Sequence, residues 1–87
     1  MNVIIAEDHA LIIDGLRAVL EQQGINVFPA MNEKVLFHLL NEQPFDVLIQ
    51  DIRFGKVDAR TIIPSIRQEF PALRIIALTS LDDLASI

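Results

Sequence analysis

Apolar runs alternate along this chain with segments in which apolar residues recur at helical spacing. The runs are short, rich in valine and isoleucine, and lie at residues 3–6, 25–28, 46–50 and 74–79. Each run predicts a β-strand. In the intervals, leucine, isoleucine and valine recur every three or four positions, which predicts helices with one apolar face. We therefore expect strands and helices to alternate along the chain.

Capping and breaking residues mark the predicted boundaries. Gly24 follows the first helical segment as a C-terminal cap, and Asn32 precedes the second as an N-terminal cap. Pro29 is expected to end the second strand, because proline lacks the N–H that a neighbouring strand would use. Pro64 falls within the third helical segment, so that helix either begins late, near Thr61, or is kinked.

The third apolar run indicates how the strands are arranged. Val47, Leu48 and Ile49 are consecutive apolar residues, which is typical of a strand covered on both faces. Strands that alternate with helices form parallel sheets through right-handed crossovers. The 87 residues have room for one small domain. We predict a single α/β domain, with a parallel sheet and helices on both faces.

The composition narrows the partners of this segment. The net charge is −5 and the 7 lysines and arginines are scattered, so we expect no direct contact with nucleic acid. No cysteine is present, which excludes a disulfide framework and a thiolate metal site. The apolar runs are too short for a membrane span, and the start lacks the pattern of a secretory signal. We therefore expect a cytoplasmic protein without membrane contact.

Acidic and hydroxyl side chains follow three of the predicted strands. Glu7 and Asp8 come after the first strand, Asp51 follows the third, and Thr79 ends the fourth. Ligands of open parallel sheets bind beyond the carboxyl ends of the strands. If the third strand lies between the first and the fourth, these side chains share one edge. Clustered carboxylates suit Mg²⁺. A carboxylate can also accept a phosphoryl group, and Asp51 is the best candidate by position.

Three blocks of the sequence together resemble one protein family. They are IIAEDHAL at residues 4–11, PFDVLIQDIR at 44–53 and FPALRIIALTS at 70–80. The chain is similar along its whole length to the receiver domains of two-component response regulators. It is most similar to those that precede a LuxR/NarL-type DNA-binding domain. The resemblance implies a flavodoxin-like sheet with strand order 2-1-3-4, the order that begins the sheet of the chemotaxis response regulator.

The resemblance also implies a role for each polar residue at this edge. Asp51 would be the phosphorylated aspartate, Asp8 a direct Mg²⁺ ligand, and Glu7 an acidic partner that reaches the ion through water. Arg53 would contribute its backbone carbonyl to the ion. The Thr79 hydroxyl would bind a phosphoryl oxygen and thereby switch the following loop. A sensor histidine kinase or small phosphodonor would supply the phosphoryl group, and transcription would be the output.

The loop after the acceptor departs from the family pattern. Receiver domains usually have D-x-x-M-P-G-x-x-G here, whereas this chain has Gly55 at the proline position, Lys56 at the first glycine and Ala59 at the second. We therefore expect a polar loop over residues 51–58 with altered geometry or extra mobility. This leaves open a second hypothesis, a pseudo-receiver that acts as an interaction or dimerisation module without phosphorylation.

Receiver domains also have a fifth strand followed by a lysine, and the sequence ends before both. We expect the chain to cover a partial receiver domain, without its remainder and without a DNA-binding output domain. Ser80 and Asp83 form a capping box, which predicts the start of a helix near the end of the sequence. The fourth strand would leave an apolar edge unpaired, which predicts self-association.

Some of these residues also have simpler interpretations. Glu7 and Asp8 can be solvated acids at a helix start, and Asp51 an ordinary turn residue. His9 and Lys56 are expected to be structural or solvated. An aspartate-dependent phosphotransferase of the haloacid-dehalogenase type needs D-x-D-x-T after its first strand, and the EDHA that stands there does not match. We therefore expect no enzyme activity.

Overall fold

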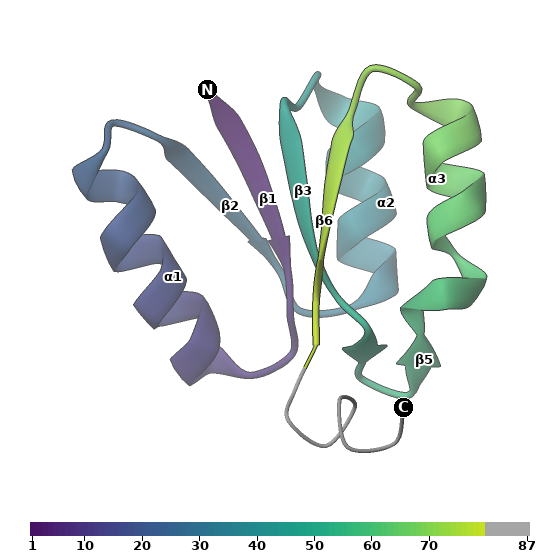
Figure 1. Ribbon diagram of the computed structural model, residues 1–87, viewed down its shortest axis with the longest axis horizontal. Helices are drawn as coiled ribbons and strands as arrows, with labels where there is room; N and C mark the ends of the chain where they lie inside the picture. The colour runs from purple at the N-terminus through teal and green to yellow at the C-terminus, as the bar shows by residue number, and fades with distance from the viewer. Residues whose placement is uncertain (80–87) are drawn as a thin grey trace.

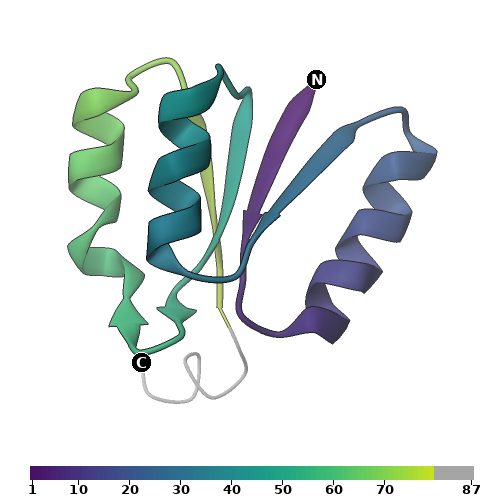
Figure 2. The same ribbon diagram turned by 180° about the vertical axis from the view of Figure 1, so that it is seen from behind.

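One four-stranded parallel sheet with helices against both faces forms the body of the protein (Figures 1 and 2). The structure is a computed structural model that describes residues 1–79. Its elements, in chain order, are β1 (Asn2–Ala6), α1 (Ala10–Gln22), β2 (Asn26–Ala30), α2 (Glu33–Glu42), β3 (Val47–Asp51), β4 (Arg53–Phe54), β5 (Val57–Asp58), the 3₁₀ turn η1 (Ala59–Thr61), α3 (Ile63–Glu69) and β6 (Arg74–Leu78).

The strand order of the main sheet is β2-β1-β3-β6. Its three neighbouring pairs are all parallel. Since β6 is the fourth of the predicted strands, the α/β, flavodoxin-like fold and the order 2-1-3-4 are confirmed. The order places β3 between β1 and β6 and brings the carboxyl ends of these three strands to one edge.

Two apolar clusters hold the layers together, one on each face of the sheet. On one face, α1 packs over the sheet through a cluster that contains Ile5 and Ile13, with Ile49 of β3 against it. On the other face, α2 and α3 pack over a larger cluster that contains Leu48 of β3 and Ile66 of α3. β3 contributes to both clusters, which explains why its apolar residues run consecutively.

The helix caps predicted from the sequence are confirmed. Gly24 has a φ of +78°, and its N–H donates to the carbonyl of Glu21 at 3.0 Å, closing the last turn of α1. The Asn32 side chain accepts a hydrogen bond from the N–H of Val35 at 2.9 Å, which begins α2. These two local signals place both helices where the hydrophobic spacing indicates them.

The two prolines in question have different outcomes. Pro64 lies in the first turn of α3, where a helix does not need its N–H, so the late start is confirmed. The prediction that Pro29 ends β2 is wrong, because the strand continues to Ala30 and Pro29 stands opposite Ile5 of β1. β2 lies at the edge of the sheet, where a proline can turn the side without an N–H to solvent.

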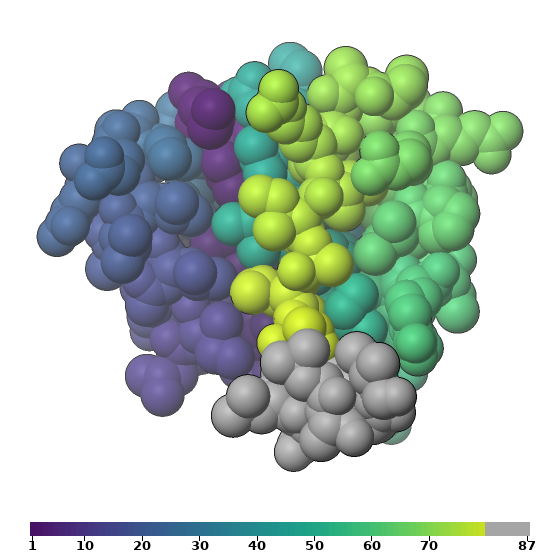
Figure 3. Space-filling view, in the orientation of Figure 1, coloured from purple at the N-terminus to yellow at the C-terminus, as the bar shows by residue number. Residues whose placement is uncertain are grey.

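Part of one sheet face and one sheet edge lie open in the described chain. Figure 3 shows the atoms of β6 on the surface between α1 and α3. Ile76 of β6 is 53% exposed, and β6 is the edge strand opposite β2 within residues 1–79. The predicted capping box of Ser80 and Asp83 lies outside the described residues. None of the helices within residues 1–79 is long and apolar enough to cross a membrane.

Candidate functional site

The carboxyl ends of β1, β3 and β6 meet at the lower edge of the sheet in Figure 1. Glu7 and Asp8 follow β1 directly, and Asp51 is the last residue of β3. Asp51 stands level with Leu78 of β6, so Thr79 is the next residue beyond this row. The sheet therefore brings the strand ends that carry the predicted site residues to one edge.

Four side chains form a compact cluster at this edge. Glu7, Asp8, His9 and Asp51 each offer one ligand atom, and these atoms all lie within 4.8 Å of one another. Three of the four are carboxylates selected from the sequence. His9 was expected to be structural, and its position directly after two acids is the signal that would have included it.

Glu7 is deeply buried for a charged residue, with 2% of its surface exposed. Its Oε1 accepts a hydrogen bond from the backbone N–H of His9 at 3.0 Å and lies 2.5 Å from His9 Nδ1. This side-chain hydrogen bond, together with the charges of Asp8 and Glu7, raises the pKa of His9. When His9 is protonated, it places a positive charge at the rim of the carboxylate cluster.

Asp51 is 9% exposed, and its environment makes the carboxyl unusually basic. Burial, a side-chain hydrogen bond with Glu7 and the charge of Glu7 raise the pKa of Asp51 to about 6. The backbone N–H of Arg53, which donates to Asp51 Oδ1 at 3.2 Å, acts in the opposite direction. Asp51 is therefore mostly ionised at neutral pH, yet it is more basic than an ordinary aspartate, which suits a nucleophile.

Asp8 carries a buried oxygen that no described residue satisfies. Its Oδ1 accepts no hydrogen bond within residues 1–79, and His9 Nδ1 approaches it only to 3.4 Å. Leaving a buried acceptor unsatisfied costs about 1–3 kcal/mol, and repulsion among the three carboxylates adds to that cost. A hard divalent cation would offset both terms, because it prefers oxygen ligands. The residues present therefore fit such a cation.

The stretch after Asp51 folds back as a small hairpin in which β4 pairs with β5. Gly55, in its turn, has a φ of +61°, which glycine adopts without strain and proline cannot. The N–H of Ala59 donates to the carbonyl of Ile52 at 2.8 Å and closes the base. Phe54 is only 2% exposed and anchors the hairpin in the core. The prediction of a polar loop is therefore wrong here, because a buried aromatic residue ties the segment down.

Arg53 is the first residue of β4, and Thr79 comes one residue after the end of β6, although it was expected to be the last residue of that strand. Arg53 is exposed, and its backbone N–H donates to Asp51 Oδ1 at this edge. Thr79 is exposed and follows β6 directly. The predicted metal contact of the Arg53 carbonyl and the predicted phosphoryl contact of the Thr79 hydroxyl stay predictions.

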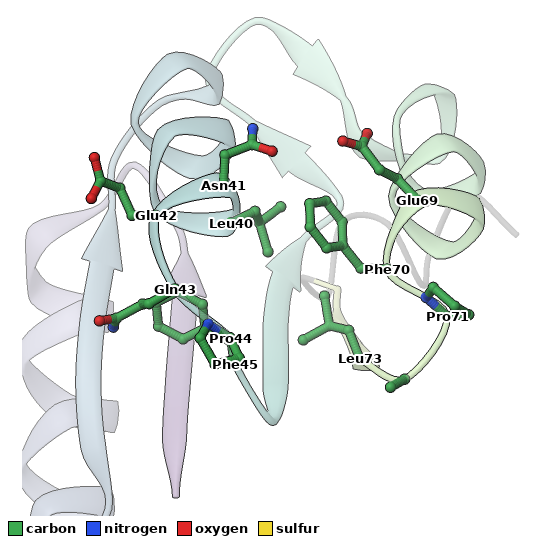
Figure 4. Close-up of a pocket in the computed structure, with 11 residues that line it drawn as sticks. Leu40, Asn41, Glu42, Gln43, Pro44, Phe45, Glu69, Phe70, Pro71 and Leu73 are labelled. Atoms are coloured by element: carbon green, nitrogen blue, oxygen red, sulfur yellow. The ribbon is translucent and has the colours of Figure 1, made fainter.

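A cavity of about 530 Å³ opens at the opposite end of the sheet, below the ends of α2 and α3 (Figure 4). Leu40, Phe70 and Leu73 point toward one another within it, and Glu42 and Glu69 stand at its rim. Its walls are mainly apolar. The cavity is therefore separate from the carboxylate cluster, which lies at the opposite edge of the sheet.

Comparison with known proteins assigns the family. The family model described as "Response regulator receiver domain" matches residues 3–87. The transcriptional regulatory protein RcsB of Escherichia coli (strain K12) is 38% identical over 86 residues, which cover 91% of this chain and 39% of RcsB. The alginate biosynthesis transcriptional regulatory protein AlgB of Pseudomonas aeruginosa is 26% identical over 79 residues, covering 91% of this chain and 18% of AlgB. The chain thus spans well under half the length of these relatives.

Solved structures agree with this assignment. RcsB from Salmonella enterica serovar Typhimurium, bound to promoter rprA in the presence of phosphomimetic BeF₃⁻, has a TM-score of 0.81 at 38% identity, with 91% of this chain and 42% of that chain covered. A response regulator from Thermotoga maritima has a TM-score of 0.81 at 25% identity, with 97% and 72% covered. A Burkholderia pseudomallei response regulator with a phosphorylated aspartic acid, a calcium ion and citrate shares the fold, with a TM-score of 0.83 at 24% identity and 90% and 46% covered.

The likeness to RcsB confirms the resemblance to receiver domains of LuxR/NarL-type regulators that the three sequence blocks indicated. The strand order, the acidic edge and the family match over residues 3–87 all point the same way. The chain belongs to the response regulator receiver domain family.

Proposed function

We propose that this chain is the phosphoacceptor module of a two-component response regulator and that Asp51 accepts the phosphoryl group. One observation carries the proposal: a nearly buried Asp51 carboxylate grouped with Glu7 and Asp8 at the carboxyl edge of the sheet. The likeness to RcsB, solved in the presence of a phosphomimetic, supports it.

The transfer uses the carboxylate of Asp51 as a nucleophile. One of its oxygens attacks the phosphorus of the donor, and an O–P bond forms while the bond from phosphorus to the donor atom breaks. The electron pair of that bond leaves with the donor's nitrogen or oxygen. The pKa of Asp51, raised to about 6 by burial and by Glu7, keeps the carboxylate basic but largely ionised at pH 7. The Arg53 N–H orients it by donating to Oδ1.

Mg²⁺ is the cation that we propose for this site. Asp8 and Asp51 would hold it directly, Glu7 through water, and Arg53 through its backbone carbonyl. When bound, the ion offsets negative charge on the transferring group. The Oδ1 of Asp8 supports this assignment, because it is buried and accepts no hydrogen bond within residues 1–79. Mg²⁺ suits a site with few protein carboxylates, since it keeps several waters.

The remaining roles follow from the same proposal. The Thr79 hydroxyl would donate to a phosphoryl oxygen and shift the population of two states of the following loop. A sensor histidine kinase or a small phosphodonor would be the donor. In the intact protein the output would be transcription, as the promoter-bound structure of RcsB suggests. We further propose a cytoplasmic location, self-association, no direct contact of this segment with nucleic acid, and no enzymatic turnover.

A pseudo-receiver is the second candidate function, and the hairpin after Asp51 favours it. Gly55 stands in its turn with a φ of +61°, at the position where the family usually has proline. A backbone that differs here from the usual loop would change where the Arg53 carbonyl lies relative to a cation. The chain would then act as an interaction module that takes no phosphoryl group.

Mass spectrometry of the intact chain separates the two candidates. The chain is incubated with a small acyl phosphate and Mg²⁺, and we expect the mass of one phosphoryl group to be gained. Asp51→Asn should gain none, and a chelator should abolish the gain. Asp46→Asn, at the other end of β3, is the matched control and should behave as the parent. A parent that gains no mass, or an Asp51→Asn variant that still does, would contradict the proposal.

A further inference from the structure

Gln50 is a buried polar residue that the proposed function does not use. It lies in β3 directly before Asp51 and is 0% exposed. Its neighbours in the adjacent strands are Ala6 of β1 and Ala77 of β6. Alanine on both sides leaves room for a long side chain beneath α2 and α3, on the face where Leu48 also points. The sheet is therefore built to accommodate the Gln50 amide.

The Gln50 amide holds the peptide that follows Asp51. Its Nε2 donates a hydrogen bond to the main-chain carbonyl of Asp51 at 3.0 Å. The N–H of the same peptide unit belongs to Ile52 and donates to the carbonyl of Leu78 in β6 at 3.0 Å. Both polar groups of the peptide are thus bonded, one to a side chain of β3 and the other to a neighbouring strand. This fixes the plane in which the chain leaves the sheet.

Stability alone does not explain a glutamine at this position. The Oε1 of Gln50 is buried and accepts no hydrogen bond from residues 1–79. A buried acceptor without a donor is unfavourable, and an apolar side chain of similar size would avoid that cost. The hydrogen bond from Nε2 offsets the cost only in part. A role of the amide in holding the neighbouring main chain in place accounts for a glutamine at position 50.

The peptide that Gln50 holds controls two groups of the acidic edge. A rotation of this peptide would turn the Asp51 main chain on one side and move Arg53 on the other. The N–H of Arg53 reaches back to Oδ1 of Asp51 at 3.2 Å, so the same rotation would break that contact. The bond between Gln50 and the Asp51 carbonyl, together with the bond from the Ile52 N–H to Leu78, therefore supports the contact between the Arg53 N–H and the Asp51 carboxylate.

We infer that Gln50 is a positioning residue for Asp51: its amide locks the peptide after Asp51 and so aims the carboxylate and the Arg53 main chain at the incoming phosphoryl group. The inference rests on the proposed function. It assigns a role to a residue that contacts the main chain of Asp51 and lies outside the carboxylate cluster itself.

The test replaces the amide by a side chain of the same length without a hydrogen-bond donor, Gln50→Met. The control is Leu48→Met, which introduces the same side chain on the same face of β3, at a position that is also 0% exposed. We expect Gln50→Met to be at least as resistant to urea as Leu48→Met, because it removes the unsatisfied Oε1. Its initial rate of phosphoryl incorporation should nevertheless fall about five- to tenfold, the loss expected from one hydrogen bond. Leu48→Met should keep the rate of the parent.

Amide hydrogen exchange gives a second measurement that does not depend on phosphorylation. The N–H groups of Ile52 and Arg53 should exchange about fivefold faster in Gln50→Met than in Leu48→Met. The reason is that the amide of residue 50 no longer holds the peptide unit that joins Asp51 to Ile52. If the parent takes no phosphoryl group, the proposed function fails and exchange alone decides the role of Gln50. Unchanged exchange, an unchanged incorporation rate, or a Gln50→Met chain that unfolds while Leu48→Met folds would each overturn the inference.

Discussion

β3 has an aspartate at each end, and the two differ in almost every physical respect. Asp46 precedes the strand, is exposed, and accepts a hydrogen bond from the backbone N–H of Asn2 at 2.7 Å. Asp51 ends the strand, is 9% exposed, and shares its surroundings with two further carboxylates, Glu7 and Asp8. Asp46 joins the beginnings of β1 and β3, whereas Asp51 is placed among like charges.

The two aspartates differ in what their surroundings do to the ionised carboxylate. The hydrogen bond of Asp46 stabilises the fold, since a charged acceptor in solvent gains from a main-chain donor. The burial of Asp51 beside Glu7 is unfavourable for the ionised form and raises its pKa to about 6. Buried carboxyl groups with strongly shifted pKa values cluster at functional sites, and this agrees with the proposed phosphoacceptor role of Asp51.

The largest expected effect is a loss of stability when the aromatic residue that packs near either end of β3 is replaced by alanine. Phe54 is 2% exposed and anchors the hairpin next to Asp51, whereas Phe70 is half-buried beside the cavity at the other end. Phe54→Ala should lower the free energy of unfolding by about 3–5 kcal/mol, because it leaves a hole in the core. Phe70→Ala should cost clearly less. Urea denaturation measures both, and equal losses would show that the hairpin is not tied to the core as described.

The next largest effect is a change in the free energy of unfolding that has opposite signs when asparagine replaces Asp51 and when it replaces Asp46. With divalent cations removed at pH 7, Asp51→Asn should raise the free energy of unfolding by about 1–3 kcal/mol, because it removes a buried charge beside Glu7. Asp46→Asn should lower it by about 0.5–1 kcal/mol, because the bond from Asn2 loses its charged acceptor. Thermal or urea unfolding decides, and a destabilised Asp51→Asn would contradict the electrostatic account.

The same carboxyl predicts how stability depends on pH. Folded Asp51 binds its proton up to about pH 6, whereas the unfolded chain releases it near the ordinary value of 3.8. Between these values the folded state holds more protons, so the contribution of Asp51 to stability falls as the pH rises. Asp51→Asn should remove this fall and Asp46→Asn should keep it. Unfolding curves from pH 4 to pH 7 without divalent cations provide the comparison.

The smallest expected effect is the loss of stability when alanine replaces either of two glycines with positive φ, which lie near opposite edges of the sheet. Gly24 has a φ of +78° and Gly55 a φ of +61°, so an alanine at either position should cost about 1 kcal/mol. Within residues 1–79, no atom beyond the glycine and its two chain neighbours lies within 4 Å of the added methyl group at either site, so the cost is one of backbone conformation. Only Gly55→Ala should also weaken Mg²⁺ binding, which calorimetry measures. A matching loss in Gly24→Ala would show that the metal site responds to general destabilisation.

Local sequence signals were sufficient to predict most of the fold. Periodic apolar residues placed the strands and helices, and Gly24 and Asn32 marked boundaries that the hydrogen bonds confirm. Pro29 was misjudged because its effect depends on whether the strand is an edge strand, which only the assembled sheet decides. The hairpin after Asp51 was missed because the sequence does not indicate that Phe54 is buried, and only this burial shows that the segment is tied to the core.

The site was partly predictable for a similar reason. Carboxylates that follow parallel strands meet at one edge whatever the loops do, so Glu7, Asp8 and Asp51 could be grouped from the sequence. The strand ends alone did not include His9, although it directly follows the two acids, and they did not include Gln50. The contact of His9 depends on how the chain turns after β1, and that of Gln50 on the peptide it reaches in its own strand.

Asp51, Glu7 and Asp8 are proposed to form one site that binds a divalent cation. NMR titration of the Asp51 side-chain carboxyl carbon, with and without Mg²⁺, tests this site most directly. We expect a midpoint at about pH 6 without the cation, as burial and Glu7 dictate, and a clear shift to lower pH when Mg²⁺ is added. A midpoint near the ordinary value of 3.8 that Mg²⁺ does not move would contradict the account.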